Sequence, residues 1–465
     1  MYFEQFYLGC LSHASYLLGS DGVAVVVDPQ RDVELYLKAA AEQSLRIEHI
    51  FETHLHADFV SGHQELAERT GARVYISREA QAEFQHIAIE DGFNLNFGRC
   101  RLQVLATPGH TPESVSLLVF DPEKGKRPWA VLTGDTLFIG DVGRPDLSPT
   151  HSPQQLASML FDSLHQKLLS LPDTVLVYPA HGAGSLCGRN MRAERFSTIG
   201  TERLTNSALR IETKDEFVRE ITANLPARPD YFLSDAEINR RGAEPLDQLP
   251  QIAPLSPEQL SRIIESDEAI ALDVRAAEEF AAGHVPRSVN IGLSGQFASW
   301  AGILFGLATP LVLIANSDDQ IDEARTRLAR IGIEQVVGFL SGGIDSWRRS
   351  SMPIATVARI GADQVIQSMS SHTITVLDVR RPSEWEESHL EGAVSRPLDY
   401  FRVGAPDIPA NEHVAVHCKS GYRSMIAASL LKRAGFTEVL DVIGGFDALS
   451  KLPAAALSTP AAVSR

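Results

Sequence analysis

The second half of the chain repeats one pattern of residues at a distance of about 100 positions. Each copy begins with Leu-Asp-Val-Arg, has a histidine eleven residues after the aspartate, and ends in Gly-Gly-x-Asp. The first copy occupies 272–275, 284 and 342–345, and the second occupies 377–380, 389 and 444–447. This period is too long for a solenoid and fits two tandem domains. Strand-like and helical segments alternate in both copies, which predicts an α/β fold with parallel sheets.

The first 245 residues follow a different pattern, in which β-rich stretches end in loops that contain His, Asp and Gly. The proline-containing stretch 246–257 is the expected linker to the repeated part. We therefore expect domains over 1–245, 258–356 and 357–465, the last of them with a short C-terminal tail. A length of 465 residues agrees with about three domains.

Composition excludes several classes of protein. The 42 Lys and Arg against 59 Asp and Glu give a formal charge of −17, so neither nucleic acid nor an anionic membrane is an expected partner. The longest apolar cluster, Val23–Val27, has the length of a strand, and the first residues lack the basic start of a secretory signal. Four widely spaced cysteines do not form a disulfide scaffold, and we expect a cytoplasmic protein.

Histidine and aspartate residues gather at the ends of strand-like runs in the first domain. Residues 53–58 read Thr-His-Leu-His-Ala-Asp, and Gly-His, Gly-Asp and His-Gly pairs follow at 109–110, 134–135 and 181–182. Strand ends can hold ligands from distant parts of a sequence at one point. Imidazole together with carboxylate suits a first-row transition metal better than calcium or magnesium. The candidate ligands are His54, His56, Asp58, His110, Asp135 and His181.

This part of the chain resembles the metallo-β-lactamase superfamily, whose fold is an αββα sandwich with the metal between two sheets. The first motif of that family is His-x-His-x-Asp-His, and Phe59 stands at its last position here. Since the missing histidine would bind a second metal, the resemblance argues against a two-zinc hydrolytic site. Asp58 and His181 alone could support at most a weakly bound second metal.

Within the superfamily, the chain is most similar to the persulfide dioxygenases, a branch with a single nonhaem iron. The segments that carry this resemblance are 53–62, 107–114, 133–135, 140–146 and 179–185. The resemblance implies one Fe(II) per chain, with zinc as the alternative, and positions left open for O2 and substrate. The ligands it implies are His54, His110 and Asp135. The residues it implies to orient those ligands or a bound thiolate are His56, Asp58 and His181.

Two features after His181 leave alternatives open. Arg189, Arg192, Arg195 and Arg203 are candidates to bind the carboxylates of an anionic carrier such as glutathione, although for each one alone a solvated helix face is the favoured interpretation. Cys187 lies six residues after His181, where its thiol could accept sulfur, be oxidised or simply pack.

The last domain places a cysteine where a strand ends and a helix begins. The strand-like run 414–417 leads into Cys-Lys-Ser-Gly-Tyr-Arg-Ser at 418–424, and a helical pattern follows. Backbone N–H groups at a helix start and the cation of Arg423 both favour a thiolate or a persulfide anion on Cys418. The sequence therefore predicts Cys418 and Arg423 as catalytic residues. The expected persulfide cradle is formed by Lys419, Ser420, Gly421, Tyr422 and Ser424.

This loop and its flanking motifs resemble the rhodanese sulfurtransferases over about 361–452. The middle domain has the same frame, but Ala315 and Asn316 stand at the nucleophile position, followed by Ser-Asp-Asp. It resembles a rhodanese without its nucleophile, for which a scaffold, docking or dimer role is the hypothesis. The expected architecture is a multidomain α/β protein, with an αββα metallo-β-lactamase sandwich followed by two α/β rhodanese domains with parallel sheets.

Both families that the chain resembles act on sulfane sulfur, which implies a bifunctional enzyme of sulfide detoxification. Iron and O2 would oxidise a small thiol persulfide to sulfite, and a Cys418 persulfide would couple this step to the formation or use of thiosulfate. The resemblance is also compatible with a homo-oligomer. One alternative is a zinc-dependent thioesterase similar to hydroxyacylglutathione hydrolase, against which Phe59 argues. Another is a sulfur carrier with a structural metal, which the open ligand set disfavours.

Overall fold

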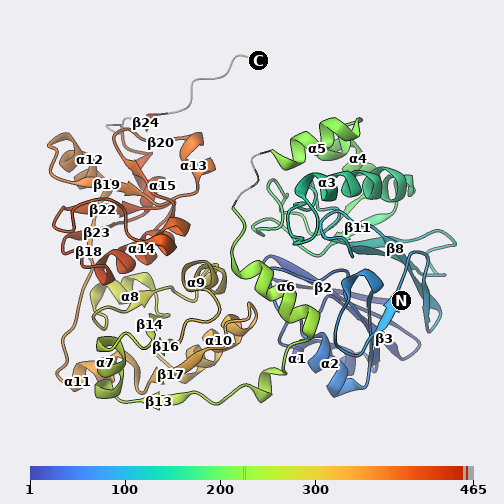
Figure 1. The fold of residues 1–465 in the computed structure, drawn as a ribbon, viewed down its shortest axis with the longest axis horizontal. Coiled ribbons are helices and arrows are strands. Elements are labelled where there is room, and N and C mark those ends of the chain that lie inside the picture. The colour runs from blue at the N-terminus through green and yellow to red at the C-terminus, as the bar shows by residue number, and fades with distance from the viewer. Residues whose placement is uncertain (224, 226, 454–456, 459–465) are drawn as a thin grey trace. The chain divides into compact units, whose positions relative to one another are not determined.

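The computed structural model describes residues 1–465 except 224, 226, 454–456 and 459–465, so most of the expected C-terminal tail lies outside the described residues. The chain divides into two compact units (Figure 1). The first contains Met1–Leu249 and Ala329–Gly332, and the second contains Pro250–Leu328 and Ile333–Arg465. Among the residues described, no helix combines the length and the apolar character that crossing a bilayer would require.

The first unit is built on two six-stranded sheets. The strands of one sheet, in spatial order, are β1 (Tyr2–Leu8), β2 (His13–Ser20), β3 (Val23–Val27), β4 (Arg46–Phe51), β5 (Arg73–Ser77) and β6 (Ile87–Ile89). The strands of the other are β12 (Ser197–Thr198), β11 (Leu176–Pro179), β10 (Ala130–Gly134), β9 (Val115–Phe120), β8 (Cys100–Ala106) and β7 (Asn94–Phe97). Strands β3 to β6 pair in parallel, as do β10 and β11, so several strand ends point the same way.

Helices cover the outer faces of both sheets, with α1 and α2 on one side and α3, α4 and α5 on the other (Figure 1). The helices of this unit are α1 (Glu34–Glu42), α2 (His63–Thr70), α3 (Pro153–Asp162), α4 (Ile199–Thr205), α5 (Lys214–Thr222) and α6 (Tyr231–Arg241). Side chains along β2 alternate between the two faces of its sheet. Tyr16 and Leu18 face the other sheet, while Leu17 packs in the cluster under α1 and α2. This is the αββα sandwich expected from the sequence.

The second unit contains two five-stranded sheets with the same strand order and parallel pairing, one for each copy of the repeat. The first sheet consists of β13 (Ala253–Leu255), β17 (Val336–Leu340), β16 (Leu311–Ile314), β14 (Ile270–Asp273) and β15 (Val289–Asn290). The second consists of β18 (Ala358–Ile360), β23 (Val439–Val442), β22 (Val414–His417), β19 (Thr375–Asp378) and β21 (Val394–Ser395). The short strands β20 (His389–Leu390) and β24 (Leu457–Ser458) pair with each other. The predicted tandem α/β domains are confirmed.

The helices of the second unit follow the same repeat. Those of the middle domain are α7 (Pro257–Glu265), α8 (Ala277–Ala282), α9 (Phe297–Phe305), α10 (Asp318–Ala329) and α11 (Gly343–Arg349). Those of the last domain are α12 (Ala362–Ser370), α13 (Pro382–Glu387), α14 (Tyr422–Arg433) and α15 (Gly445–Leu449).

The repeated histidines have structural roles in both domains. His284 donates from Nδ1 to the Phe280 carbonyl over 2.9 Å and stacks on the Phe280 ring at 3.8 Å between centroids. His389 forms the same hydrogen bond and stack with Trp385, at 2.9 Å and 3.7 Å. Each histidine therefore ties the chain that leaves a helix back to that helix, which explains its recurrence in the sequence.

Candidate metal centre and sulfur-transfer loop

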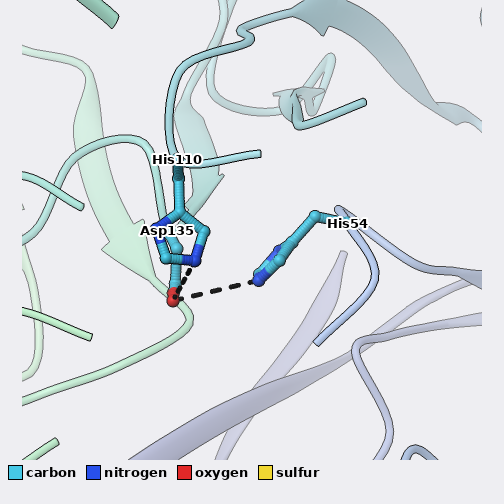
Figure 2. Close-up of side chains that lie close together, drawn as sticks. All are labelled: His54, His110 and Asp135. Carbon is cyan, nitrogen blue, oxygen red and sulfur yellow. Dashed lines mark ion pairs between the residues drawn. The ribbon is translucent and has the colours of Figure 1, made fainter. Parts of the chain in front are cut away.

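Three of the predicted ligands meet where strands of both sheets end. His54 follows β4, His110 lies between β8 and β9, and Asp135 follows β10. Their side chains point toward one another in Figure 2, with the Oδ2 atom of Asp135 lying 3.4 Å from Nε2 of His110 and 3.9 Å from Nε2 of His54. All three residues are buried. The ends of strands from both sheets thus bring distant residues to one point.

The donor atoms of this group fit a transition metal. Within the described part of the chain, the buried Nε2 atoms of His54 and His110 have no hydrogen-bond partner. Buried polar nitrogens almost always have one, so two orphaned atoms facing one carboxylate indicate that a ligand completes the group. Two imidazoles and one carboxylate leave further coordination positions open, unlike a closed structural zinc site.

The remaining atoms of the ligands are held by hydrogen bonds. His110 donates from Nδ1 to the Arg144 carbonyl over 3.0 Å, which directs Nε2 into the site. Thr53 donates its hydroxyl proton to Asp28 and lies 3.0 Å from Nδ1 of His54, so it accepts from that nitrogen. Such bonds fix the tautomer and the ring orientation of a metal-binding histidine.

Burial and the local charges hold these groups in the protonation states that bind metals. Burial lowers the pKa of His54 and His110 below the ordinary value, which keeps both rings neutral. Burial alone would raise the pKa of Asp135, but the imidazoles of His181, His110 and His54 outweigh it, and the net pKa is far below the usual range. Neutral imidazole and ionised carboxylate are the forms that metal coordination requires.

The other three candidates from the sequence occupy two different surroundings. His181 lies 2.7 Å from Asp135 through Nδ1 and 2.9 Å from Asp58 through Nε2, so it links the two carboxylates. His56 turns to another pair of buried acids, with Nε2 at 3.2 Å from Asp28 and 3.4 Å from Glu52. His181 and Asp58 thus support the triad directly, and His56 adjoins it only through its ring, 4.2 Å from that of His54.

The thiol of Cys187 lies beside two of the candidate residues, Asp58 and His181. One ligand atom each from Cys187, Asp58 and His181 lie within 4.8 Å of one another, and all three residues are buried. Burial raises the pKa of the Cys187 thiol well above its usual value, with the charges of Asp58 and Asp135 adding to the effect. The protonated thiol is the stable form in these surroundings.

The sequence interpretation missed His13, at the start of β2. Its ring lies 4.1 Å from that of Phe59 and 5.4 Å from that of His181, and its buried Nε2 atom lacks a hydrogen-bond partner among the residues described. No motif surrounds His13, and the only signal was a histidine between small residues at the start of an apolar strand. It reaches the site because its backbone bridges to His181.

Three of the four arginines after His181 have partners in the surrounding chain. Arg192 pairs with Glu202 at 2.7 Å and Arg203 with Asp173 at 3.2 Å, while Arg189 donates to backbone carbonyls at the end of α5. Arg195 lies over the ring of Tyr7. These contacts favour the structural interpretation of the arginines over carrier binding.

Cys418 lies at the end of β22, immediately before the loop that starts α14. The Gly421 N–H donates to the Cys418 Sγ atom over 3.2 Å, and Ser424 Oγ lies 3.8 Å from the same sulfur. From the other side, the Phe446 N–H donates to the Cys418 carbonyl over 2.7 Å. Gly445 makes this approach feasible, since an added Cβ would lie 2.5 Å from that carbonyl oxygen. The repeated Gly-Gly pair therefore allows the start of α15 to pack against the Cys418 loop and hold it in place.

The other loop residues divide into exposed and anchored groups. Lys419 and Ser420 are exposed at the mouth of the loop. Arg423 forms two bonds with the carboxylate of Glu384, at 2.6 and 2.8 Å. Burial by itself lowers the pKa of Arg423, but the carboxylate of Glu384 outweighs this effect and the net pKa is raised. The guanidinium therefore stays charged, and it is paired with Glu384. Tyr422 is anchored through its hydroxyl, which donates to the Gly292 carbonyl over 2.9 Å.

The middle domain lacks a nucleophile at the matching position. Asn316 donates from Nδ2 to Glu279 over 2.9 Å, and Glu279 stands six residues after the repeated aspartate just as Glu384 does. In the middle domain, the Asn316 amide therefore binds Glu279, which is the counterpart of the Glu384 that binds Arg423 in the last domain. The domain keeps the frame of the loop and has no thiol to accept sulfur.

Comparison with known proteins agrees with this organisation. The family described as metallo-beta-lactamase superfamily matches residues 8–181, and the rhodanese-like domain family matches residues 256–350 and 361–452. The mitochondrial persulfide dioxygenase of Bos taurus is 35% identical over 223 residues, which are 46% of this chain and 77% of that protein. The human counterpart is 34% identical over 221 residues, with the same shares.

The chain is also similar to a hydrolase and to a solved metallo-beta-lactamase structure. A hydroxyacylglutathione hydrolase from Francisella philomiragia is 32% identical over 172 residues, which are 37% of this chain and 63% of that protein. The crystal structure of a metallo-beta-lactamase from Staphylococcus aureus has a TM-score of 0.65 and 32% identity, over 73% of this chain and 98% of that one. The chain therefore belongs to the metallo-β-lactamase superfamily as a homologue of the persulfide dioxygenases, and it carries two rhodanese-like domains after that part.

Proposed function

We propose that the protein is a bifunctional enzyme of sulfur metabolism. Its metal centre oxidises a low-molecular-weight thiol persulfide, such as glutathione persulfide, with Fe(II) and O2. Its C-terminal domain transfers sulfane sulfur through Cys418, to or from thiosulfate. The observation that carries the proposal is the open three-ligand group with two orphaned imidazole nitrogens, beside which Phe59 stands where a second metal would need a histidine. The identity to mitochondrial persulfide dioxygenases supports the same assignment.

In this proposal His54, His110 and Asp135 hold the iron. Fe(II), when bound, supplies the electrons and the open positions at which O2 becomes reactive. His181 donates to the carboxylate of Asp135, at 2.7 Å from Oδ1 and 3.0 Å from Oδ2, and so would orient it toward the metal. The buried ring of Phe59 keeps water from the side where a hydrolytic enzyme would hold a second metal. The net reaction is RSSH + O2 + H2O → RSH + SO3²⁻ + 2H⁺.

The second reaction uses the Cys418 loop. The Cys418 thiolate attacks the outer sulfur of thiosulfate, a new S–S bond forms on Cys418, and the S–S bond of thiosulfate breaks to release sulfite. The Gly421 N–H, 3.2 Å from Sγ, stabilises the anionic sulfur. The reverse direction uses the same groups, with sulfite as the acceptor. Sulfite is therefore the product of one site and a reactant or product of the other, which couples the two domains chemically.

The test is O2 uptake by protein loaded anaerobically with Fe(II) after glutathione persulfide is added, with sulfite and thiosulfate measured together. We expect uptake with both products. A Cys418→Ser variant should consume O2 and release sulfite but form no thiosulfate. Cys100→Ser, which changes a buried cysteine in β8, is the control and should behave as wild type.

Two results would refute the proposal. Thiosulfate formed by Cys418→Ser at the normal rate would refute the coupling through Cys418. No O2 uptake by iron-loaded protein, together with turnover of S-lactoylglutathione by zinc-loaded protein, would establish the hydroxyacylglutathione hydrolase alternative, which the Francisella relative suggests and Phe59 opposes.

A further inference from the structure

We propose that the middle domain, which has no nucleophile, positions the sulfur-transfer loop of the last domain. The contact is between Tyr422, in the loop after Cys418, and residues 292–295 of the middle domain, which we call the clamp segment. The inference rests on the sulfur-transfer half of the proposed function and does not involve the metal centre. Both domains belong to the same compact unit.

Tyr422 connects the clamp segment to the sulfur. Its hydroxyl donates to the Gly292 carbonyl over 2.9 Å, and its ring lies against Gly295, where an added Cβ would be 3.4 Å from the ring. Tyr422 is the first residue of α14 and directly follows Gly421, whose N–H donates to the Cys418 sulfur. An anchored Tyr422 therefore fixes the peptide that supplies this donor.

The clamp segment is itself held by its own domain. Arg327, in α10, is almost fully buried and donates to the carbonyls of Leu293 and of Gly295, the latter over 2.9 Å. The Leu293 N–H donates to the Val274 carbonyl over 3.1 Å, which ties the segment to the end of β14. Tyr422 thus meets a segment that is held in place by contacts within its own domain.

Contacts continue along the rest of α14, which lies against α8 and β15 (Figure 1). The Asn290 N–H donates to Ser429 Oγ over 3.0 Å, and Arg433 donates to the Arg287 carbonyl over 3.0 Å. The opposite side of the loop is held inside its own domain by α15. The loop therefore has one support from each domain, which explains why the middle domain keeps the rhodanese frame without the chemistry.

The test compares two variants that disturb the clamp from opposite sides. Tyr422→Phe removes only the hydroxyl, and Arg327→Met removes the bonds that hold the clamp segment. Tyr400→Phe and Arg348→Met are the controls, because both residues are exposed and lie outside the clamp. The measurements on the full chain are thiosulfate-to-cyanide sulfur transfer and amide hydrogen exchange of residues 419–424. Sulfite formation by the iron-loaded protein is followed in parallel.

We expect both clamp variants to lose about tenfold in kcat for sulfur transfer, because a displacement of about 1 Å at a reacting group can cost about 100-fold and the loss of one support should displace the loop by less. Exchange of the loop amides should become faster, while sulfite formation and both controls stay unchanged. Transfer rates within twofold of wild type, with unchanged exchange, would overturn the proposal.

Hydrogen exchange separates this inference from the proposed function. If the wild-type protein transfers no sulfur, the proposed function fails, and faster loop exchange in both clamp variants would still support the clamp. If Arg327→Met does not fold, Tyr422→Phe decides, since it removes one oxygen atom and leaves the ring in place. Unchanged loop exchange in Tyr422→Phe would then count against the clamp.

Discussion

His181 donates from Nδ1 to the carboxylate of Asp135, 2.7 Å from Oδ1 and 3.0 Å from Oδ2, and holds it where Oδ2 faces His54 and His110. Its Nε2 atom forms an ion pair with Asp58, 2.9 Å away. In the proposed metal centre, the chain Asp58–His181–Asp135 therefore orients an iron ligand with residues that are candidates for a second metal position. This relationship leads to the first of five predictions.

Replacement of His181 by Asn should weaken metal binding without abolishing it. Asp135 would keep its carboxylate but lose the bond that orients it, and the loss of such a partner typically costs 10- to 100-fold in affinity, roughly. Iron retained after equilibration with a graded series of chelator concentrations measures this change. His151→Asn, a histidine at the start of α3, is the control. Equal retention by wild type and His181→Asn would show that Asp135 needs no such support.

Gly143→Ala should prevent metal binding, because the added Cβ would displace both His110 and Asp135. An added Cβ at Gly143 would clash with the Asp135 carbonyl and lie 2.9 Å from Nδ1 of His110. We expect a cost of about 1–3 kcal/mol in stability and a large loss of bound iron. The control is Gly9→Ala, whose Cβ would meet nothing within 4 Å among the described residues. Metal-to-protein ratio and thermal transition are the measurements, and normal iron content in Gly143→Ala would contradict the geometry.

Phe59→His should raise the metal content above one ion per chain. The substitution restores the histidine missing from the His-x-His-x-Asp-His motif, next to Asp58 and His181, which are already in place. Metal analysis after loading with zinc would report the stoichiometry, with Phe138→His, another buried phenylalanine near His181, as the control. A stoichiometry of one in Phe59→His would mean that the ion pair between Asp58 and His181 is more favourable than binding of a second metal ion by these residues.

Gly445→Ala should abolish sulfur transfer by displacing the Cys418 loop. An added Cβ would lie 2.5 Å from the Cys418 carbonyl and 2.7 Å from that of Lys419. Since the φ of Gly445 is +54°, part of the cost is backbone strain, and Gly435→Ala controls for it: its φ is +96° and, in the described structure, nothing lies within 4 Å of its Cβ. We expect Gly435→Ala to be destabilised by about 1 kcal/mol from strain alone, Gly445→Ala to be destabilised further by the clash, and only Gly445→Ala to lose activity. Equal activity would exclude displacement of the loop.

Acidification should destabilise the second unit through His284. Burial lowers the pKa of this imidazole to about 4, against 6.5 in the unfolded chain. The unfolded state therefore binds the proton first, so the contribution of the neutral ring is complete above pH 6.5 and is lost as the pH falls toward 4. The loss is about 2 kcal/mol between pH 7 and pH 5. Urea unfolding of wild type and His284→Asn at both pH values measures it, and an identical pH dependence of the two proteins would refute the assignment.

Local spacing in the sequence was sufficient for the fold and for most of the candidate site. The repeat of Leu-Asp-Val-Arg and Gly-Gly-x-Asp identified two tandem domains, because each motif sits at a fixed place on one sheet. The pairs at 109–110 and 134–135 marked strand ends, and the packing of the two sheets then brought His110 and Asp135 together with His54. Predictions of this kind succeed because strand ends and helix starts are set by neighbouring residues.

Only the tertiary structure decided the partners of the buried polar groups. His56 and His54 are two residues apart, yet His56 faces Asp28 and Glu52 instead of the triad. Arg423 is paired with a carboxylate 39 residues earlier in the chain, and Tyr422 reaches a carbonyl in another domain. A buried charge or donor requires a partner, and packing of distant elements determines which one is within reach. Sequence thus determined which side chains could act, and packing determined which of them meet.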